Sequence, residues 1–187
     1  YIMKESLEKD FIIQGLKGSI FSKNIHIYEI ISSTNTLAKE MATKGAPHGT
    51  VVLAEEQTAG KGRLDRWWLS RGHENLLFTI LLRPQLDIDK IFVLTMSLAI
   101  AAIDAIKEMI GLRTMIKWPN DLYINRKKLG GILTEFSVKD SFVEYVIIGL
   151  GMNINWMPDE ENEILYPATS ILAETGVRVS RNELLID

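Results

Sequence analysis

The chain has 187 residues, no cysteine and a formal net charge of -3 at pH 7, and hydrophobic residues make up 47% of it. This length and composition indicate one compact soluble domain, while the lack of cysteine excludes disulfides, thiolate zinc sites and cysteine nucleophiles and fits a cytoplasmic location. The weakly acidic charge argues against a general nucleic-acid binder. The most apolar stretch, residues 91–110, contains Asp104, Lys107 and Glu108, so it predicts a buried amphipathic helix and no membrane span.

The first part of the chain predicts a strand and a helix after a short lead-in. Residues 1–24 are mixed and weakly helical, and residues 25–30 are apolar enough for a strand. Residues 32–35 offer several N-cap candidates for a helix that Gly45 ends.

Two buried strands and the long helix come next. Residues 50–54 and 75–82 are the apolar strands, and the stretch between them is polar and contains glycines. Asp89 is the candidate N-cap of the long helix, and Gly111 marks its C-terminal end.

The second half of the chain predicts a sheet. Its strand-like segments are residues 113–118, 122–124, 128–138 and 142–155, with tight turns near 125–126 and 139–140. Early helices followed by successive strands indicate an α+β fold, with a mixed, mostly antiparallel sheet and flanking helices. Regular βαβ alternation is absent, which argues against a doubly wound nucleotide-binding fold.

The end of the chain predicts one more helix. Residues 180–183 read Ser-Arg-Asn-Glu, a capping-box pattern that leads into an apolar run. Because this run stops at Asp187, and because the chain begins with Tyr1, we expect the sequence to be part of a longer protein.

The most informative segment runs from Gln57 to Trp68. Its two glycines allow a ligand to approach the backbone closely, and the cations Lys61, Arg63 and Arg66 can hold phosphate or carboxylate oxygens. The paired tryptophans at its end can shield a site or stack on a base. The spacing fits neither a Rossmann fingerprint nor a P-loop. By itself, this segment also fits a solvated basic loop.

Two further segments contain candidate polar groups: residues 117–121, Lys-Trp-Pro-Asn-Asp, and residues 128–133, Lys-Leu-Gly-Gly-Ile-Leu. The proline makes a rigid break at which Asn120 and Asp121 can point outward, although both residue types are also common in simple turns. Lys128 fits either a cation that stabilises a negatively charged transition state or a lysine that snorkels at a strand end.

A third segment, residues 146–155, is an apolar strand that contains Gly149 and Gly151. Glycines inside a strand indicate a ligand or another backbone packed against it, or a β-bulge. Taken singly, none of these segments decides between its alternatives.

Their order along the chain is more specific. Five segments together resemble the catalytic core of biotin–protein ligases of the BirA type: residues 33–35, 57–68, 117–121, 128–133 and 149–153. The resemblance covers roughly residues 20–180. It implies the fold of class II aminoacyl-tRNA synthetases, with residues 25–187 as the catalytic domain and residues 1–24 as a lead-in. It also implies activation of biotin by ATP and Mg²⁺ to biotinyl-AMP, and transfer of the biotin to a lysine of a biotin carboxyl carrier domain.

The resemblance assigns roles to individual residues. Those similar to biotin-binding positions are Ser33, Thr34, Gln57, Gly60, Arg63, Lys128, Gly131, Leu133, Gly149 and Gly151. Those similar to positions that bind ATP and the adenylate are Arg63, Arg66, Trp68, Lys117, Asn120 and Asn153. Lys128 matches the lysine regarded as catalytic, assisted by Arg63 and Lys117, and Asp121 is the candidate to orient or deprotonate the acceptor lysine. No residue is assigned to the metal.

Two positions depart from the family pattern. Lys61 stands where many members have arginine, which keeps the charge but loses the fork geometry. Asp65 stands where glycine is common, and we expect it to slow closure of the loop or to pair with Arg63 or Arg66. The two adjacent tryptophans leave open which ring covers the adenine.

Two modules of the family are not expected in this chain. Residues 1–24 are too few for a winged helix-turn-helix, so we expect no DNA binding from this chain. The small C-terminal β-domain would begin after about residue 187, so transfer of biotin is expected to be impaired. Family members often dimerise through sheet edges, which leaves a homodimer open, and no membrane partner is expected.

Two other functions compete with this interpretation. A lipoate–protein ligase shares the fold and the acyl-adenylate lysine, but the 57–68 loop and the Lys-Trp-Pro-Asn-Asp segment favour biotin. A biotin-sensing module without catalysis is the other, and the joint presence of Lys128, Arg63 and Asp121 argues against it.

Overall fold

A seven-stranded sheet forms the centre of the protein, with strand order β1-β2-β5-β9-β8-β7-β6. The structure is a computed structural model that describes residues 5–64, 66–157 and 167–187. The strands are β1 (Ile25–Ile31), β2 (Thr50–Gln57), β5 (Asn75–Leu82), β6 (Met115–Lys117), β7 (Asp121–Ile124), β8 (Lys127–Lys139) and β9 (Phe142–Asn153). β1 and β2 are parallel and the other neighbouring pairs are antiparallel, so the expected mixed, mostly antiparallel sheet is confirmed.

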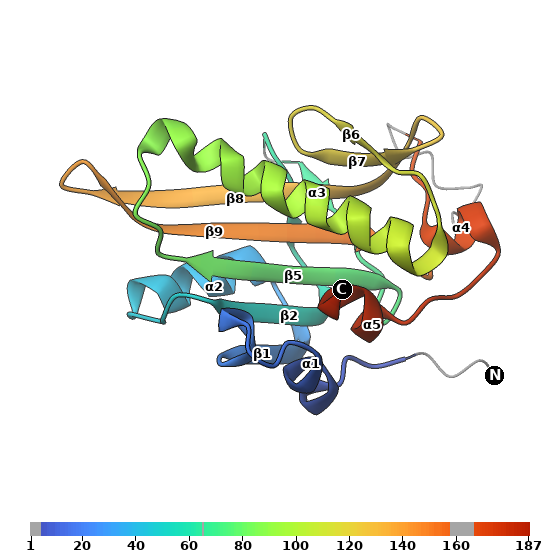
Figure 1. Cartoon of the computed structure of the whole chain (residues 1–187), viewed down its shortest axis with the longest axis horizontal. Coiled ribbons are helices and arrows are strands. Elements are labelled where there is room, and N and C mark those ends of the chain that lie inside the picture. Colours follow the sequence, from blue (N-terminus) through green and yellow to red (C-terminus); the bar gives the residue numbers. More distant parts are fainter. Residues whose placement is uncertain (1–4, 65, 158–166) are drawn as a thin grey trace.

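Helices cover both faces of this sheet (Figure 1). They are α1 (Lys9–Gly15), α2 (Thr34–Thr43), α3 (Ile91–Ile110), α4 (Ile171–Thr175) and α5 (Arg181–Ile186), with 3₁₀ turns η1 (Ile20–Ser22) and η2 (Ile88–Lys90). The polar stretch after β2 contains a small hairpin of β3 (Gly60–Lys61) and β4 (Trp67–Trp68), which the sequence analysis did not predict. Within the described ranges, no helix combines the length and the apolar character that crossing a membrane would require.

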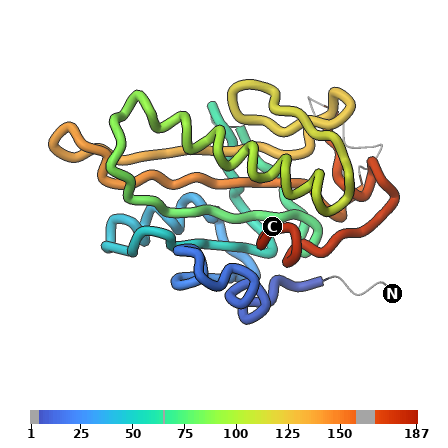
Figure 2. Tube along the Cα trace, in the orientation of Figure 1, coloured from blue at the N-terminus to red at the C-terminus, as the bar shows by residue number. Residues whose placement is uncertain are grey.

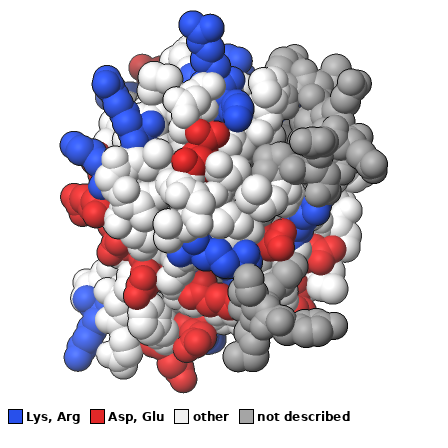
Figure 3. All heavy atoms as spheres, turned by 90° about the vertical axis from the view of Figure 1, so that its right-hand side faces the viewer, with Lys and Arg blue, Asp and Glu red and all other residues white. Residues whose placement is uncertain are grey.

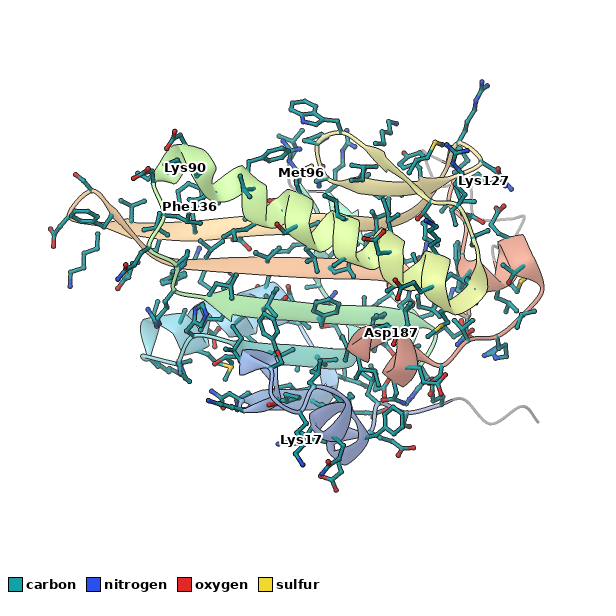
Figure 4. The ribbon with its side chains drawn as sticks, in the orientation of Figure 1. Lys17, Lys90, Met96, Lys127, Phe136 and Asp187 are labelled. Carbon is teal, nitrogen blue, oxygen red and sulfur yellow. The ribbon has the colours of Figure 1, made fainter. Side chains whose placement is uncertain are left out.

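The alternation of side chains along β9 separates the two faces. Ile148, Leu150 and Met152 belong to the main core together with α3, and side chains fill the space between this helix and the strands behind it (Figure 4). We call this the α3 face. From residue 145 onward, the residues with odd numbers point the other way, where Ile147 packs with Ala38 of α2. We call that side the α2 face.

Capping residues set the ends of the helices largely as expected. Ser33 is the N-cap of α2 and its hydroxyl accepts a hydrogen bond from the amide of Thr36, and Gly111 ends α3 in the left-handed conformation, with φ 67°. The prediction that Asp89 caps α3 was wrong. Asp89 lies inside the turn η2, and the residue before the helix is Lys90, which makes no side-chain cap. An N-cap needs extended backbone immediately before the helix, and the 3₁₀ turn removes it.

The tight turns of the second half also follow the sequence closely. Asn125 and Arg126 both have positive φ between β7 and β8, as do Asp140 and Ser141 between β8 and β9. Such values match the primed turns that suit two-residue hairpins. The second turn lies one residue later than expected.

A buried ion pair on the α3 face joins α5 to β2, and both of its members also bond to residues 5–7 near the other end of the described chain. The Arg181 guanidinium lies 2.6 Å from the Glu55 carboxylate, and their side chains are 0% and 3% exposed. Arg181 also donates to the carbonyl of Glu5, while the other Glu55 oxygen accepts from the amide of Leu7. Figure 2 shows the blue and dark red segments side by side at this place.

Glu5 is held at the same place by α5. Burial raises the pKa of Glu5, but hydrogen bonds from the Ser180 hydroxyl, the Arg181 amide and the Asn182 side chain outweigh it and hold the pKa below its ordinary value. The carboxylate form of Glu5 therefore stabilises the fold.

Candidate active site

Three glycines form a floor on the α2 face of the sheet, beyond the N-terminal end of α2. Gly151 of β9 pairs with Gly131 of β8, and Gly149 lies two residues before it on the same face. On β7, Asp121 pairs with Gly131 and continues this row toward the sheet edge. Because these glycines have no side chains, the middle of the sheet is shallow here and another group can lie directly on the backbone.

The first turn of α2 and the end of β2 form a polar cluster on one side of this floor. The amide and the hydroxyl of Thr34 both donate to Oε1 of Gln57, at 2.7 and 3.0 Å. The hydroxyl of Thr79 lies 2.8 Å from that of Thr34. Ser33 and Thr34 are 2% and 4% exposed. These predicted residues therefore lie together, with their polar atoms already oriented by one another.

Trp68 covers the other end of the floor. A Cβ atom on Gly151 would lie 2.6 Å from Cε2 of Trp68, so the indole ring rests on the glycine. The indole Nε1 is buried and has no hydrogen-bond partner among the described residues. Trp67, its neighbour in β4, is 79% exposed. The alternation of β4 thus directs Trp68, and not Trp67, onto the glycine floor.

The small hairpin that presents Trp68 depends on Gly60. A Cβ there would lie 2.5 Å from the Trp68 carbonyl oxygen and 3.2 Å from Nε2 of Gln57. Only glycine allows β3 to approach β4 so closely.

Lys128 and Asp121 form an ion pair beside the floor. Their Nζ and Oδ1 atoms are 2.8 Å apart, and the side chains are 29% and 24% exposed. The ammonium group also lies 5.8 Å from the centre of the Trp68 ring. A Cβ on Gly131 would lie 3.2 Å from Oδ1 of Asp121 and 3.3 Å from Nζ of Lys128, so the glycine makes room for this pair.

The turn between β6 and β7 adds two more predicted groups. The Arg63 guanidinium donates to Oδ1 of Asn120 at 3.1 Å, which joins the 57–68 loop to this turn. Asn120 itself donates to the carbonyl of Ile132. Lys117 pairs with Asp121 in the strand register, and its Nζ lies 4.6 Å from the centre of the Tyr123 ring. The Arg63–Asn120 contact therefore connects two of the predicted segments, and Lys117 lies beside Asp121, which pairs with Gly131 of the floor.

The comparison with known proteins identifies the family of this chain. Residues 27–153 match the family described as the biotin/lipoate A/B protein ligase family. The chain belongs to this family. The matched range contains every predicted site residue, from the polar cluster at the start of α2 to Asn153 at the end of β9.

Several relatives of the family are similar over most of this chain. The bifunctional ligase/repressor BirA of Bacillus subtilis is 39% identical, over 89% of this chain and 52% of that protein. The biotin–[acetyl-CoA-carboxylase] ligase of Paracoccus denitrificans is 37% identical, over 82% of this chain and 65% of that protein. The chain spans about half the length of the first relative and less than two thirds of the second.

Solved structures of the family share the fold. The biotin protein ligase of Aquifex aeolicus in complex with biotin and ATP has a TM-score of 0.74 and 32% identity, over 88% of this chain and 66% of that one. The Leishmania major biotin protein ligase in complex with biotinyl-5-AMP has a TM-score of 0.70 and 32% identity, over 87% of this chain and 70% of that one. The expected α+β fold of biotin ligases is therefore confirmed.

Some predicted residues take part in the fold itself. Asn153 is 7% exposed; its side chain accepts from Asn75 and donates to the carbonyl of Thr169. The backbone carbonyl of Arg66 accepts from Gly62 within the loop. The Leu133 carbonyl lies 3.2 Å from Nδ2 of Asn35. The expectation for Asp65 lies outside the described residues and stays a prediction.

Sequence reasoning did not identify Asn35 and Thr79 as site residues. Thr79 is 0% exposed in β5, and a threonine inside the apolar run 75–82 was the available signal, since a buried hydroxyl needs a partner. Asn35 was named as one of several N-cap candidates and as part of the segment 33–35 that resembles the family, but no role in the site was assigned to it.

Figure 3 views the end of the molecule that lies on the right in Figure 1. Basic and acidic side chains are interspersed over its described surface, so no large field of one sign covers this end. Among the described residues, no group of three or more His, Asp or Glu side chains could hold a metal ion.

Proposed function

We propose that this chain is the catalytic part of a biotin–protein ligase, which condenses biotin with ATP to biotinyl-AMP and passes the biotin to a lysine of a carboxylase biotin carrier domain. One arrangement carries the proposal: a glycine floor with a polar cluster at one side, the Lys128–Asp121 pair at the other and Trp68 above it. This arrangement suits a flat, largely apolar ring system that ends in a carboxylate.

The polar cluster supplies the groups for the ureido ring of biotin. Gln57 and Thr34 offer a carboxamide and a hydroxyl at the edge of the floor, with Ser33 beside them, and hydrogen-bonding groups that are already oriented lose little entropy when a ligand binds. The apolar part of biotin would lie over the backbone of Gly149 and Gly151, where side chains are absent.

The cations address the main electrostatic barrier of the first step. The biotin carboxylate must attack the α-phosphate of ATP, which brings two anions together. Lys128, Arg63 and Lys117 would offset this repulsion and stabilise the charge that develops in the transition state. Trp68, with its unpartnered indole N–H, would cover the adenine and exclude water from the adenylate.

Asp121 has a separate role in the second step. The acceptor lysine must attack as a neutral amine, so a base has to orient it and take its proton. Asp121 forms an ion pair with Lys128. When phosphate oxygens draw Lys128 away, the carboxylate becomes free to receive the amine.

Magnesium fits this site as a companion of the nucleotide. Mg²⁺ needs only one or two protein carboxylates when phosphates supply its other ligands, and Asp121 is the carboxylate in the row beside the floor. The ion would neutralise phosphate charge when it is bound.

We also propose a domain boundary, a location, a partner and an oligomeric state for this chain. We assign residues 25–187 to the catalytic domain, with residues 1–24 as a lead-in, and we place the protein in the cytoplasm with a carrier domain as its partner. DNA binding is not proposed for this chain, although the relative in Bacillus subtilis is named a repressor. A homodimer through sheet edges is proposed because β7 covers only residues 127–131 of β8, so the remaining part of β8 lies at an edge of the described sheet.

Incubating the chain with ATP and Mg²⁺, and with either biotin or lipoate, tests the proposal. We expect pyrophosphate release with biotin alone, and labelling of a purified carrier domain when it is added. Release driven by lipoate would overturn the choice of substrate. Biotin binding without any release would instead indicate a sensing module.

A further inference from the structure

Asn35, in the first turn of α2, reaches across three strands of the sheet. It is 4% exposed. Its Oδ1 accepts from the Thr79 hydroxyl of β5 at 2.7 Å, and its Nδ2 donates to the Leu133 carbonyl and the Glu135 carboxylate of β8, at 3.2 and 2.9 Å. The carboxamide therefore uses its oxygen as an acceptor and its nitrogen as a donor to two partners.

The strand that lies between these partners is β9, and Gly149 is the residue beneath the carboxamide. A Cβ on Gly149 would overlap Oδ1 of Asn35 and lie 2.9 Å from its Cγ. In the register, Gly149 pairs with Thr79 on one side and with Leu133 on the other. Because Gly149 has no side chain, the carboxamide of Asn35 occupies the space above it. We call Gly149 the seat of Asn35.

The contacts of Asn35 continue directly into the polar cluster. The Thr79 hydroxyl lies within hydrogen-bonding distance of both Asn35 and Thr34, and Thr34 makes two bonds to Gln57. A chain of polar contacts therefore runs from β8 through Asn35 and Thr79 to the groups that face the floor. Its members are buried or half-buried, so moving one leaves its neighbour without a partner, at a cost of about 1–3 kcal/mol.

We propose that Asn35 is a positioning residue for the biotin-binding half of the site and that Gly149 is its matched seat. The inference rests on the proposed function. Asn35 fixes the first turn of α2 on the sheet and so sets where Thr34 and Gln57 present their polar atoms. Position 149 must be glycine because the Asn35 carboxamide lies against it. A side chain at position 149 would disturb biotin binding by displacing this carboxamide.

A double-mutant cycle on biotin affinity tests this pairing. We expect Asn35→Ala and Gly149→Ala each to raise the biotin Kd about tenfold, which corresponds to about 1.4 kcal/mol. In the double variant the alanine methyl at position 149 occupies space that the carboxamide has vacated. The loss should therefore stay near tenfold instead of reaching about a hundredfold.

Gly151 provides the matched control, because it lies on the same face of the same strand. Its space is taken by Trp68 and not by Asn35. The effects of Gly151→Ala and Asn35→Ala on biotin affinity should therefore multiply. Asn35→Asp is a second probe, since it keeps the atom that faces Thr79 and turns an oxygen toward the two acceptors of β8. We expect it to be at least as harmful as Asn35→Ala.

Two further measurements separate positioning from general support of the fold. The KM for ATP should stay within about twofold in Asn35→Ala while the KM for biotin rises about tenfold. If Gly149→Ala yields too little folded protein, the difference between the KM for biotin and the KM for ATP in Asn35→Ala decides alone whether Asn35 is a positioning residue. Equal losses for both substrates would overturn the inference.

The remaining outcomes are also decisive. Multiplying effects at positions 35 and 149 would show that Gly149 is needed independently of Asn35, and an unchanged biotin Kd in Asn35→Ala would remove its positioning role. If the wild type fails to bind biotin, the proposed function fails and the positioning role with it. A non-additive cycle in Tm would then still support Gly149 as the seat of Asn35, and an additive one would overturn that as well.

Discussion

The two faces of β9 are built from alternating residues of one strand, and over residues 148–152 they differ sharply. Ile148, Leu150 and Met152 pack against α3 in an apolar core. Against Gly149 and Gly151, on the other face, lie the polar side chain of Asn35 and the indole of Trp68. The strand thus combines a surface that stabilises the fold with one that leaves room for ligands, because successive side chains point to opposite sides.

Variants on the two faces should therefore have different effects, on stability in one case and on activity in the other. Substitutions on the α3 face should lower the free energy of unfolding and leave the site chemistry of the remaining folded protein intact. Substitutions on the α2 face should change affinity or rate with smaller effects on stability.

The largest effect is expected from Arg181→Leu on the α3 face. It leaves the Glu55 carboxylate buried without its counter-ion, and removing one partner of a buried pair costs about 3–5 kcal/mol. Urea unfolding followed by circular dichroism measures this loss. Arg178→Leu is the matched control, because Arg178 is exposed and should change stability by less than about 0.5 kcal/mol. Equal effects would mean that the buried pair does not support the fold.

Lys128→Ala on the α2 face should give the next largest effect. It should change the rate of adenylation and not the stability of the fold. Loss of a group that stabilises transition-state charge typically lowers kcat about 10²–10³-fold. We expect the rate of pyrophosphate release to fall by this factor while the biotin Kd changes little. Lys127→Ala, whose side chain is 51% exposed and faces Glu174, should be nearly neutral. Parallel losses of binding and rate in Lys128→Ala would identify a strand-end lysine with a structural role.

Gly151→Ala should have an intermediate effect, again on the α2 face. The added methyl group would displace the indole of Trp68 from the floor. Since we propose that this ring covers the adenine, the KM for ATP should rise about tenfold, or about 1.4 kcal/mol. Trp67→Ala removes the exposed neighbouring ring and should leave the KM for ATP unchanged. A larger effect from Trp67 would assign the adenine to the other ring.

The smallest effect is expected when low pH protonates Glu5 on the α3 face. The pKa of Glu5 is lowered in the folded protein from its ordinary value of 4.5, so the unfolded chain binds more protons. The contribution of Glu5 is therefore present above pH 4.5 and is lost as the pH falls through the lowered pKa. Glu5→Gln should flatten this acid limb in urea midpoints measured against pH. An unchanged limb would show that Glu5 does not contribute to it.

The sequence predicted the layered part of the molecule well, because it depends on short-range patterns. The strand 75–82 and the helix 91–110 have the predicted bounds, and the α+β class followed from their order. Asp89 was misassigned since a 3₁₀ turn inserted before α3 leaves no mark in the hydrophobic pattern. The β3–β4 hairpin was missed because two-residue strands are defined by pairing and not by periodicity.

The site was predictable only in part for a similar reason. The resemblance to biotin–protein ligases named the residues that lie along the floor, and the structure brings them together. It could not predict that Asn35, Thr79 and Gly149 fit one another, because these residues come from three elements and meet only through the register of the sheet.

The buried pair between Arg181 and Glu55 also has a consequence for how the molecule opens. It connects β2 to α5, 126 positions apart in sequence, and Glu5, hydrogen-bonded to Ser180 and Arg181, adds the N-terminal segment to the same cluster. Residues 5–8 and α5 should therefore exchange their amide hydrogens with solvent as one cooperative unit, although neither end is long enough to be stable alone. Glu55 lies two positions before Gln57 in β2, so opening of this unit would also loosen the strand that presents Gln57 to the site.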